Sequence, residues 1–412
     1  MLPASTSSLL ADRLHGLGES QTLAMTVRAR ALRAQGFPII NLSLGEPDFP
    51  TAPHIREAAK QAIDEGNSWY TPVAGTLELR QAIADKLRRE NNISWNPENI
   101  LVSTGAKQAL ANVILALVNP GDEVLIFAPY WLTYHELVQL AGGVPVLLEG
   151  SYANQLKATA ADLSDAITPR TKLVVYSSPC NPTGAIFSRE ELTQMARVVA
   201  RHPRVLVVAD EIYEHIRFQE EYFSMASLDF VREQVITVNG FSKGYAMTGW
   251  RVGYLAAARW IVEACNAVQG QVTSGPCAIS QKAAVAALTG TQEPVRAMQE
   301  VYRRRRDLVM ELLGAIPHLP VDEPAGAFFL LPDVSYYLGR EVSGQRLATA
   351  QDLCAWLLEE AHVALVTGAP FGAPTCIRLS YATSEENLRQ ALPRLRTTLA
   401  ALVGHPQEAC YL

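Results

Sequence analysis

The stretch QVITVNGFSKGYAMTGWRVGY, residues 234–254, joins a strand pattern to a loop that carries several reactive side chains. Its first part, VITV, is rich in β-branched and apolar residues, which predicts a buried strand. Ser242, Lys243 and Arg251 follow the end of that strand. A G-x-S-x-G pattern surrounds Ser242, as around the nucleophile of many serine hydrolases. The stretch therefore offers two reactive groups, the Ser242 hydroxyl and the Lys243 amine.

Four further apolar runs precede this stretch, and helical patterns separate them. Continuous apolar runs bounded by turns are typical of strands that are buried on both faces of a mainly parallel sheet. Strands that alternate with helices predict an α/β fold. The runs are NILVST (99–104), DEVLIFA (122–128), TKLVVYSS (171–178) and RVLVVA (204–209).

The chain of 412 residues is long enough for two domains. The strand–helix alternation predicts a large domain over 50–295. The later segments GAFFLLPDV and CIRLSYA read as strands among helices, so we expect a smaller α+β domain. The N-terminal segment is expected to pack with it, which gives a discontinuous domain of 21–49 and 296–412. Residues 1–20 are polar and mixed, and are predicted to form an N-terminal arm.

Composition argues against several classes of protein. The net charge of −6 argues against nucleic acid as the main partner. The one basic run, RRRR at 303–306, is predicted to lie on a solvated helix surface. Six scattered cysteines show no C-x-x-C and no zinc spacing, which predicts no metal site and a reducing compartment. No secretory signal and no membrane-length apolar run is seen, so we expect a soluble, cytoplasmic protein.

Polar side chains follow the end of each predicted strand, where open α/β sheets bind ligands. They supply an anion-binding helix N-terminus, an aromatic ring, an amide, a carboxylate, a phenol, an amine and a guanidinium. Pyridoxal phosphate needs this set: an amine for its aldehyde, a carboxylate for its pyridine nitrogen and cationic or N–H groups for its phosphate. In chain order the residues are Gly105, Ala106, Lys107, Trp131, Asn181, Asp210, Tyr213, Ser242, Lys243 and Arg251.

Several motifs resemble those of the fold-type I, class I aminotransferases. The likeness extends from about residue 20 to 400 and is strongest to the bacterial aspartate aminotransferase subgroup, some members of which also accept prephenate. It implies a seven-stranded-type sheet, a homodimer, pyridoxal phosphate, and ping-pong transfer of an amino group between aspartate or glutamate and a 2-oxo acid such as 2-oxoglutarate. The motifs are NLSLGEPDF (41–49), SPCNPTG (178–184), DEIYEH (210–215), SKGYAMTGWRVGY (242–254) and RLSYATSEENL (378–388).

The resemblance also implies roles for single residues around the cofactor. Lys243 bonds to the cofactor aldehyde and later moves the proton, and Asp210 pairs with the pyridinium. Tyr213 and Asn181 contact the phenolate oxygen, and Trp131 stacks on the ring. The residues implied for the phosphate are Gly105, Ala106, Lys107, Ser242, Arg251 and, from the neighbouring subunit, Tyr70.

The implied substrate contacts are fewer. Arg378 grips the α-carboxylate, and Gly45 lets the backbone approach the substrate closely, beside Trp131 and Asn181. Lys107 reads the distal carboxylate of an acidic substrate, together with hydroxyls at Ser20 and Thr22.

Two positions depart from the pattern of the aminotransferases. Gly240 stands where many of these enzymes carry a phosphate-binding serine, which leaves the role of Ser242 less certain, and Cys180 replaces an asparagine. We also expect cis peptide bonds at Ala128–Pro129 and Asn181–Pro182, in tight turns of the site.

Other functions stay open at this point. They are an aminotransferase for aromatic, prephenate or broad neutral substrates, a β-lyase on the same fold, and a cofactor-binding sensor without catalysis. A serine hydrolase would pair Ser242 with an acid and then a histidine, drawn from Asp322, Asp333, His362 and His405.

Overall fold

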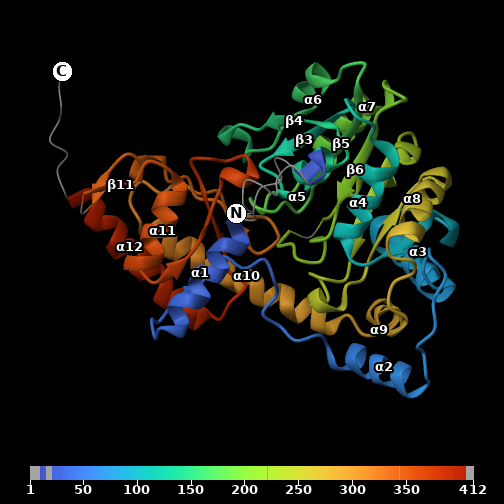
Figure 1. Ribbon diagram of the computed structural model, residues 1–412, viewed down its shortest axis with the longest axis horizontal. Coiled ribbons are helices and arrows are strands. Elements are labelled where there is room, and N and C mark those ends of the chain that lie inside the picture. Colours follow the sequence, from blue (N-terminus) through green and yellow to red (C-terminus); the bar gives the residue numbers. More distant parts are fainter. Residues whose placement is uncertain (1–9, 15–20, 220, 343, 405–412) are drawn as a thin grey trace.

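A seven-stranded sheet forms the centre of the computed structural model, which describes residues 10–14, 21–219, 221–342 and 344–404 (Figure 1). Strand β8 is antiparallel to both its neighbours, and the other pairings are parallel. The predicted α/β fold with a mainly parallel sheet is confirmed. In spatial order the strands are β2 (Ile100–Ser103), β8 (Gly253–Ala256), β7 (Val235–Gly240), β6 (Leu206–Asp210), β5 (Thr171–Ser177), β3 (Glu123–Ala128) and β4 (Val144–Glu149).

Two of these strands, β4 and β8, were not singled out from the sequence. Strand β4 lies at the sheet edge and is half exposed, so it lacks the continuous apolar run of a buried strand. Strand β8 has only four residues and directly follows the loop that contains Lys243. The five predicted runs all form strands of the sheet.

Both faces of the sheet are covered by helices, because successive strand residues point to opposite sides. Val102, Leu125 and Val174 belong to one hydrophobic cluster, whereas their neighbours in the chain belong to another. The first cluster includes α3 (Leu77–Asn91), α7 (Arg189–Ala200) and α9 (Ala278–Thr289), and α2 (Pro53–Asp64) packs on α9. The second includes α4 (Ala106–Leu117), α5 (Thr133–Leu140) and α8 (Arg259–Val272). The short α6 (Ala160–Ala166) packs on α7.

A third hydrophobic cluster joins early residues of the chain to the C-terminal part. Ile40 and Leu42 pack with side chains between Met298 and Leu402. Strand β1 (Ile40–Asn41) pairs with β12 (Val363–Ala364), and β13 (Val366–Thr367), β14 (Ile377–Ser380) and β9 (Phe329–Leu330) form a small antiparallel sheet. The helices are α1 (Gln21–Ala34), α10 (Glu293–Gly314), α11 (Ala350–Glu360) and α12 (Glu385–Gly404), and β10 (Glu341–Val342) pairs with β11 (Gln345–Arg346).

This contact between early and late residues is what a discontinuous smaller domain would require. The predicted domain limits, 21–49 with 296–412 and 50–295, stay predictions. Within the described residues, no helix has both the length and the apolar character that a membrane crossing requires.

The predicted cis bond at Ala128–Pro129 is confirmed, whereas the one at Asn181–Pro182 is wrong. The second cis bond instead lies at Ser178–Pro179, directly after β5. Asn181–Pro182 sits inside a hydrogen-bonded turn, in which Gly184 N donates to Cys180 O at 2.8 Å. The chain therefore changes direction before it reaches Asn181.

The arginine run lies within α10, which confirms the predicted helix. The prediction that the run lies on a solvated surface is wrong for Arg305. Arg305 is 7% exposed and donates through Nη1 and Nη2 to Asp48 at 2.7 and 2.8 Å. Its guanidinium also lies over the rings of Phe49 and Tyr302. Four consecutive helical positions cover most directions around the axis, so one of them faces the protein. Arg305 therefore fastens segment 41–49 to α10.

We expect Arg305→Ala to lower the free energy of unfolding by about 2 kcal/mol, since it leaves Asp48 without its bidentate partner. Arg304→Ala, from the same run, is the matched control. Arg304 is largely exposed, and its single ion pair in the described part of the chain is a long one, with Nε 4.0 Å from Glu385 Oε1. Its effect should stay within about 0.5 kcal/mol. Urea unfolding of both variants measures the difference, and equal losses would contradict the anchoring role of Arg305.

Candidate active site

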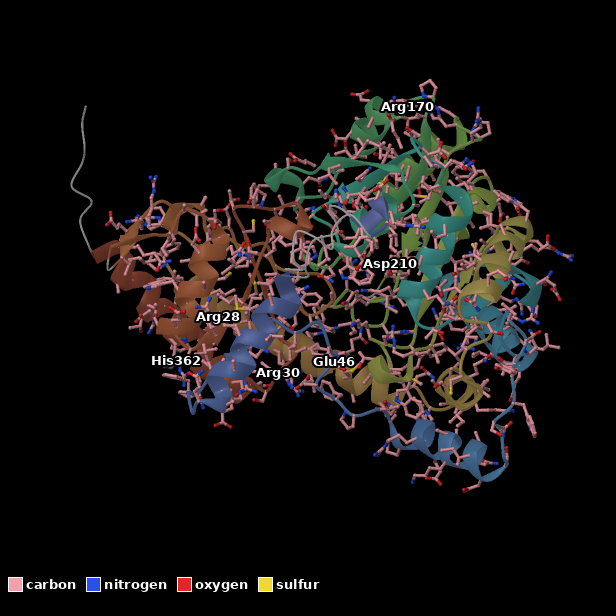
Figure 2. The ribbon with its side chains drawn as sticks, viewed as in Figure 1. Arg28, Arg30, Glu46, Arg170, Asp210 and His362 are labelled. Atoms are coloured by element: carbon pink, nitrogen blue, oxygen red, sulfur yellow. The ribbon has the colours of Figure 1, made fainter. Side chains whose placement is uncertain are left out.

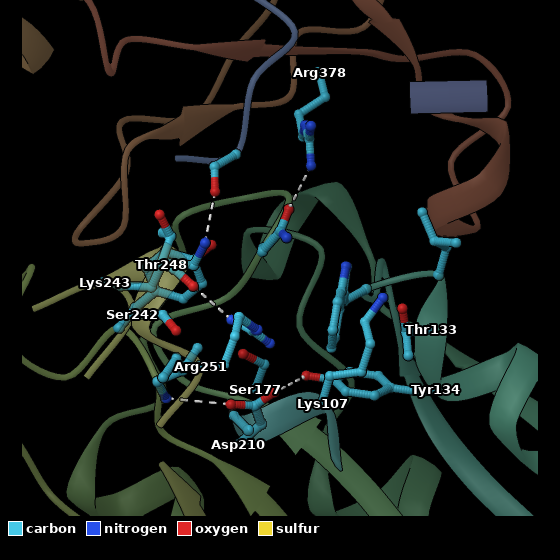
Figure 3. A pocket seen from close by; sticks show the side chains of 17 residues that line it. Lys107, Thr133, Tyr134, Ser177, Asp210, Ser242, Lys243, Thr248, Arg251 and Arg378 are labelled. Atoms are coloured by element: carbon cyan, nitrogen blue, oxygen red, sulfur yellow. Dashed lines mark hydrogen bonds between the residues drawn. The ribbon is translucent and has the colours of Figure 1, made fainter. Parts of the chain in front are cut away.

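A cavity of ≈ 340 Å³ opens at the carboxyl ends of the sheet strands, as the strand-end rule predicts (Figure 3). Tyr134 of the second hydrophobic cluster and Tyr213 of the third line it, together with Arg378 from the C-terminal part of the chain. Of the predicted site residues, the structure brings together Gly45, Ala106, Lys107, Trp131, Asn181, Asp210, Tyr213, Ser242, Lys243, Arg251 and Arg378. Gly105 lies directly behind Arg251, and Tyr70 is not among the lining residues.

Asp210 is the last residue of β6, the central strand, and is 2% exposed. Its Oδ1 accepts a hydrogen bond from Ile212 N at 3.2 Å, and its Oδ2 accepts one from the Tyr134 hydroxyl at 2.6 Å (Figure 3). Burial raises the pKa of Asp210 to about 6, and the bond from Tyr134 opposes that rise. A cationic ring nitrogen is therefore a favourable partner for this carboxylate.

Tyr134 was missed at the level of sequence. It lies within a predicted helix three positions after Trp131, and it donates to a residue 76 positions away. The only local signal was a tyrosine in the first turn of a helix at a strand end, a pattern shared by many core tyrosines. Tyr134 lies in the helix after β3, and Asp210 ends β6. Their contact therefore depends on the order of the strands in the sheet, which cannot be derived from either segment alone.

Lys243 extends into the cavity from the loop after β7. Its Nζ donates to Gly45 O at 2.6 Å and lies 5.9 Å from the centroid of the Tyr213 ring. Burial lowers the pKa of Lys243 to about 8, although the charge of Glu46 opposes that effect. A lysine amine with this pKa is partly uncharged near neutral pH, and is suited to attack an aldehyde or to accept a proton.

An anion cradle lies where α4 begins. Gly105 has a φ of +81°, and a Cβ built on it would lie 2.4 Å from Arg251 Nη2, so only glycine fits beneath the guanidinium. Arg251 is held by a bond from Nη1 to Thr248 O at 2.7 Å. The first N–H groups of α4, on Ala106 and Lys107, add the positive end of the helix dipole.

Gly240 does not face the cavity, which explains the missing serine. A Cβ on Gly240 would lie 2.8 Å from Gly253 Cα in the adjacent strand β8. A Cβ on Gly253 would in turn lie 2.3 Å from Ala106 N. The cradle loop therefore packs directly on the β7–β8 pair, with no room for a side chain. The hydroxyl groups of Ser242 and Thr248 line the cavity instead.

Arg378, on β14, reaches the cavity from the opposite side and is 3% exposed. It donates to Asn181 Oδ1 at 3.0 Å and to Ser43 O at 2.8 Å, and its guanidinium lies between the rings of Phe329 and Phe371. Burial lowers its pKa to about 10, so it remains a cation at neutral pH. Its buried Nε has no hydrogen-bond partner in the described part of the chain. This arrangement suits a carboxylate ligand.

Lys107 lies beside the indole of Trp131, with Nζ 4.9 Å from the ring centroid. Burial, and then the nearby charge of Arg251, lower the pKa of Lys107. The hydroxyls predicted to assist it are not tested, because Ser20 is outside the described residues and the side chain of Thr22 is not described.

Tyr70 is 96% exposed and its neighbour Trp69 is 84% exposed. Neither ring lines the cavity of its own chain. Two adjacent aromatic rings with so much exposed surface are typical of an interaction site rather than of a solvated loop.

The serine hydrolase hypothesis is wrong. No histidine occurs among the described residues that line the cavity beside Ser242. The His362 ring packs against Phe37 at a tilted angle of 52°, and His362 lies far from Asp210, on the side of α1 (Figure 2). Asp333 accepts bonds from Tyr152 and Ser335 N, Asp322 lines a separate cavity, and His405 is outside the described residues. Within the part of the chain that the structure describes, the Ser242 hydroxyl therefore has no histidine beside it to act as a general base.

As a whole, the cavity can hold a flat ring with an anionic tail. The indole of Trp131 would offer a stacking surface, the Asp210 carboxylate would suit a cationic ring nitrogen, and the first N–H groups of α4 with Arg251 would suit the anionic tail. Two amines with a lowered pKa line the cavity, those of Lys107 and Lys243, and burial lowers the pKa of Lys243 to about 8.

Comparisons with known proteins agree with this geometry. The family described as "Aminotransferase class I and II" matches residues 38–395. The bifunctional aspartate aminotransferase and glutamate/aspartate-prephenate aminotransferase of Petunia hybrida is 46% identical over 398 residues, which cover 95% of this chain and 83% of that protein. The aspartate/prephenate aminotransferase of Cereibacter sphaeroides is 43% identical and covers 96% of this chain and 100% of its own length.

Solved structures give the same result. The aspartate aminotransferase from Rhizobium meliloti has a TM-score of 0.92 at 42% identity, over 95% of this chain and 99% of its own. The Thermus thermophilus aspartate aminotransferase with maleate has a TM-score of 0.87 at 43% identity, over 94% and 99%. The predicted resemblance is confirmed, and the chain belongs to the class I and II aminotransferase family.

Proposed function

We propose that this protein uses pyridoxal phosphate to transfer the amino group of aspartate or glutamate to a 2-oxo acid such as 2-oxoglutarate, in a ping-pong cycle. The observation that carries the proposal is the meeting of the Lys243 amine, the Asp210 carboxylate and the Arg251 guanidinium in one cavity. When bound, pyridoxal phosphate supplies an electron sink for the negative charge that develops at the substrate Cα.

Each part of the cofactor has a partner among the chain's own residues. Asp210 holds the proton of the ring nitrogen, and Tyr134 and Ile212 N hold Asp210 in place. Tyr213 and Asn181 face the phenolate oxygen, and Trp131 stacks on the ring. The phosphate is received by Gly105, Ala106, Lys107, Ser242 and Arg251.

Lys243 performs the proton transfers. Its Nζ, with a pKa lowered to about 8, accepts the proton from the substrate Cα and later returns it on the product side. The bond to Gly45 O orients the amine toward the side of the cavity where Arg378 binds the α-carboxylate.

The preference for an acidic substrate rests on a second cation. Arg378 binds one carboxylate, and Lys107 is available for a distal one. The relatives named for aspartate, and the Thermus thermophilus structure with maleate, a dicarboxylate, support this reading. Prephenate is the second candidate acceptor, because two of the similar proteins are named for both substrates. A β-lyase and a non-catalytic sensor have no such support.

The active protein is proposed to be a homodimer in which Tyr70 reaches the phosphate of the partner's cofactor. The 96% exposure of Tyr70 in the single chain, next to exposed Trp69, supports a position at a subunit interface. A C2 arrangement would place one Tyr70 in each of two equivalent sites.

Lys243→Ala should abolish transamination, because it removes both the amine for the aldehyde and the proton carrier. We expect the purified wild-type protein to show a visible chromophore that borohydride bleaches and aspartate converts to the aminated form. Lys60→Ala, an exposed lysine with a surface ion pair, is the control and should keep both properties. Normal turnover by Lys243→Ala would refute the assignment.

Lys107→Ala should raise the KM for aspartate by about 10- to 100-fold, since one charged hydrogen bond to the distal carboxylate is lost. The KM for alanine, which has no distal carboxylate, should stay within about twofold. Lys107→Arg keeps the charge and should retain most of the aspartate preference. An unchanged KM for aspartate in Lys107→Ala would remove this basis for specificity.

Hybrid dimers test the role of Tyr70. Co-expression of Lys243→Ala and Tyr70→Phe chains with different affinity tags should give a hybrid with one intact site, because the Lys243→Ala chain supplies Tyr70 to the other subunit's Lys243. We expect the purified hybrid to be more active than the sum of the two parent homodimers. Activity no greater than that sum, or a monomer by light scattering, would contradict the shared site.

A further inference from the structure

A buried polar network lies behind the turn that carries Asp210 and Tyr213. The side chains of these two residues line the cavity. The same turn also carries Glu211 and Glu214, which are 1% and 3% exposed. Their carboxylates form hydrogen bonds with residues that do not line the cavity. No step of the proposed reaction uses them, so their burial needs another explanation.

Glu214 is held by three donors from two elements. Lys86 Nζ of α3 donates to Oε1, and Asn91 Nδ2, also of α3, donates to Oε2 at 2.7 Å. Asn239 Nδ2 of β7 donates to Oε1 at 2.8 Å. Lys86 is 1% exposed and also donates to Asn91 Oδ1 at 2.7 Å. The ion pair therefore ties the turn after β6 to helix α3, and the hydrogen bond from Asn239 ties the same carboxylate to strand β7.

The network also touches the Lys243 loop at two points. Asn239 lies four residues before Lys243 and accepts a hydrogen bond from Gly240 N at 2.7 Å. His215, which follows Glu214, fills the space beside Gly244, where an added Cβ would lie 2.8 Å from the imidazole. The loop is thus held before and after the reactive lysine.

Lys86 lies between two carboxylates, because it is bonded to Glu214 and its Nζ is also 3.7 Å from Glu90 Oε2. Lys86 and nearby groups lower the pKa of Glu214 despite its burial, so it is ionised beside Lys86. Burial, followed by the charge of Glu214, raises the pKa of Glu211 to about 8, so Glu211 is largely uncharged at neutral pH. Apolar residues of similar size would stabilise such a core at least as well as an ion pair, which points to a role in geometry.

We propose that the Lys86–Glu214 ion pair fixes the separation of the two strand ends that carry Asp210 and Lys243, so that Lys86 is a positioning residue for the reaction. The inference rests on the proposed function, because these strand ends hold opposite sides of the cofactor. A displacement of about 1 Å between reacting groups lowers rates on the order of 100-fold.

The test is Lys86→Met in the cofactor-loaded enzyme, with two readouts. Titration of the apoenzyme with pyridoxal phosphate, followed by its absorbance, should give a dissociation constant about tenfold higher than wild type. The kcat should fall on the order of 10- to 100-fold, while the KM for aspartate stays within about twofold, because Arg378 lies on the other side of the cavity.

A matched control separates positioning from general stability. Lys157→Met breaks a second, partly buried ion pair, that of Lys157 with Glu191 at 2.6 Å, and neither residue lines the cavity. It should keep wild-type cofactor affinity and kcat even where its melting temperature falls as far as that of Lys86→Met. The double variant Lys86→Met/Glu214→Gln should recover most of the lost affinity. The amide oxygen at position 214 can accept from Asn239 Nδ2, and the amide NH2 can donate to Asn91 Oδ1, which has lost its bond from Lys86.

Three results would overturn the proposal. They are wild-type affinity and kcat in Lys86→Met, equal losses in Lys157→Met, and no recovery in the double variant. If Lys86→Met does not fold, Asn239→Ala replaces it, because this variant keeps the ion pair but removes the bond from β7 to Glu214. Wild-type cofactor affinity and kcat in Asn239→Ala would then overturn the proposal. A wild-type protein that forms no borohydride-sensitive chromophore would instead refute the proposed function itself.

Discussion

A carboxylate buried at the end of the central strand is the constraint on which the rest of the site depends. Asp210 is nearly inaccessible to water, and burial of an unpaired carboxylate is costly. The structure meets this cost with the Tyr134 hydroxyl and Ile212 N, and leaves room in the cavity for a cationic partner. The position of Asp210 then sets where a ring nitrogen must lie, and so the distances to Lys243 and Arg251.

The remaining charges of the cavity are mostly positive. Four basic side chains line it, those of Lys107, Lys243, Arg251 and Arg378, against the single carboxylate of Asp210 among the described lining residues. Each cation raises the free energy of the others, which contributes to the lowered pKa of both lysines. Anionic groups relieve this repulsion. A phosphate and a dicarboxylic substrate are therefore matched to the cavity by electrostatics as well as by shape.

Much of this organisation could be predicted from the sequence, because it is written in local patterns. Apolar runs gave the strands, and the rule that ligands bind at strand ends brought Asp210, Asn181 and Lys243 together. The rest depends on contacts between distant segments. Tyr134 meets Asp210 across 76 positions, and Arg305 meets Asp48 across 257. Whether a helical tyrosine or arginine faces solvent or a distant partner is decided by packing, which no single segment encodes.

Gly240 shows how such packing can change a chemical assignment. Judged from the sequence, it marked a missing phosphate ligand; in the fold, it is one of two glycines that let strand β8 pack against the cradle loop. A serine here would force Gly253, and with it Ala106 N, away from the place where the anion is received. The chain thus lacks that hydroxyl because the backbone itself occupies the space.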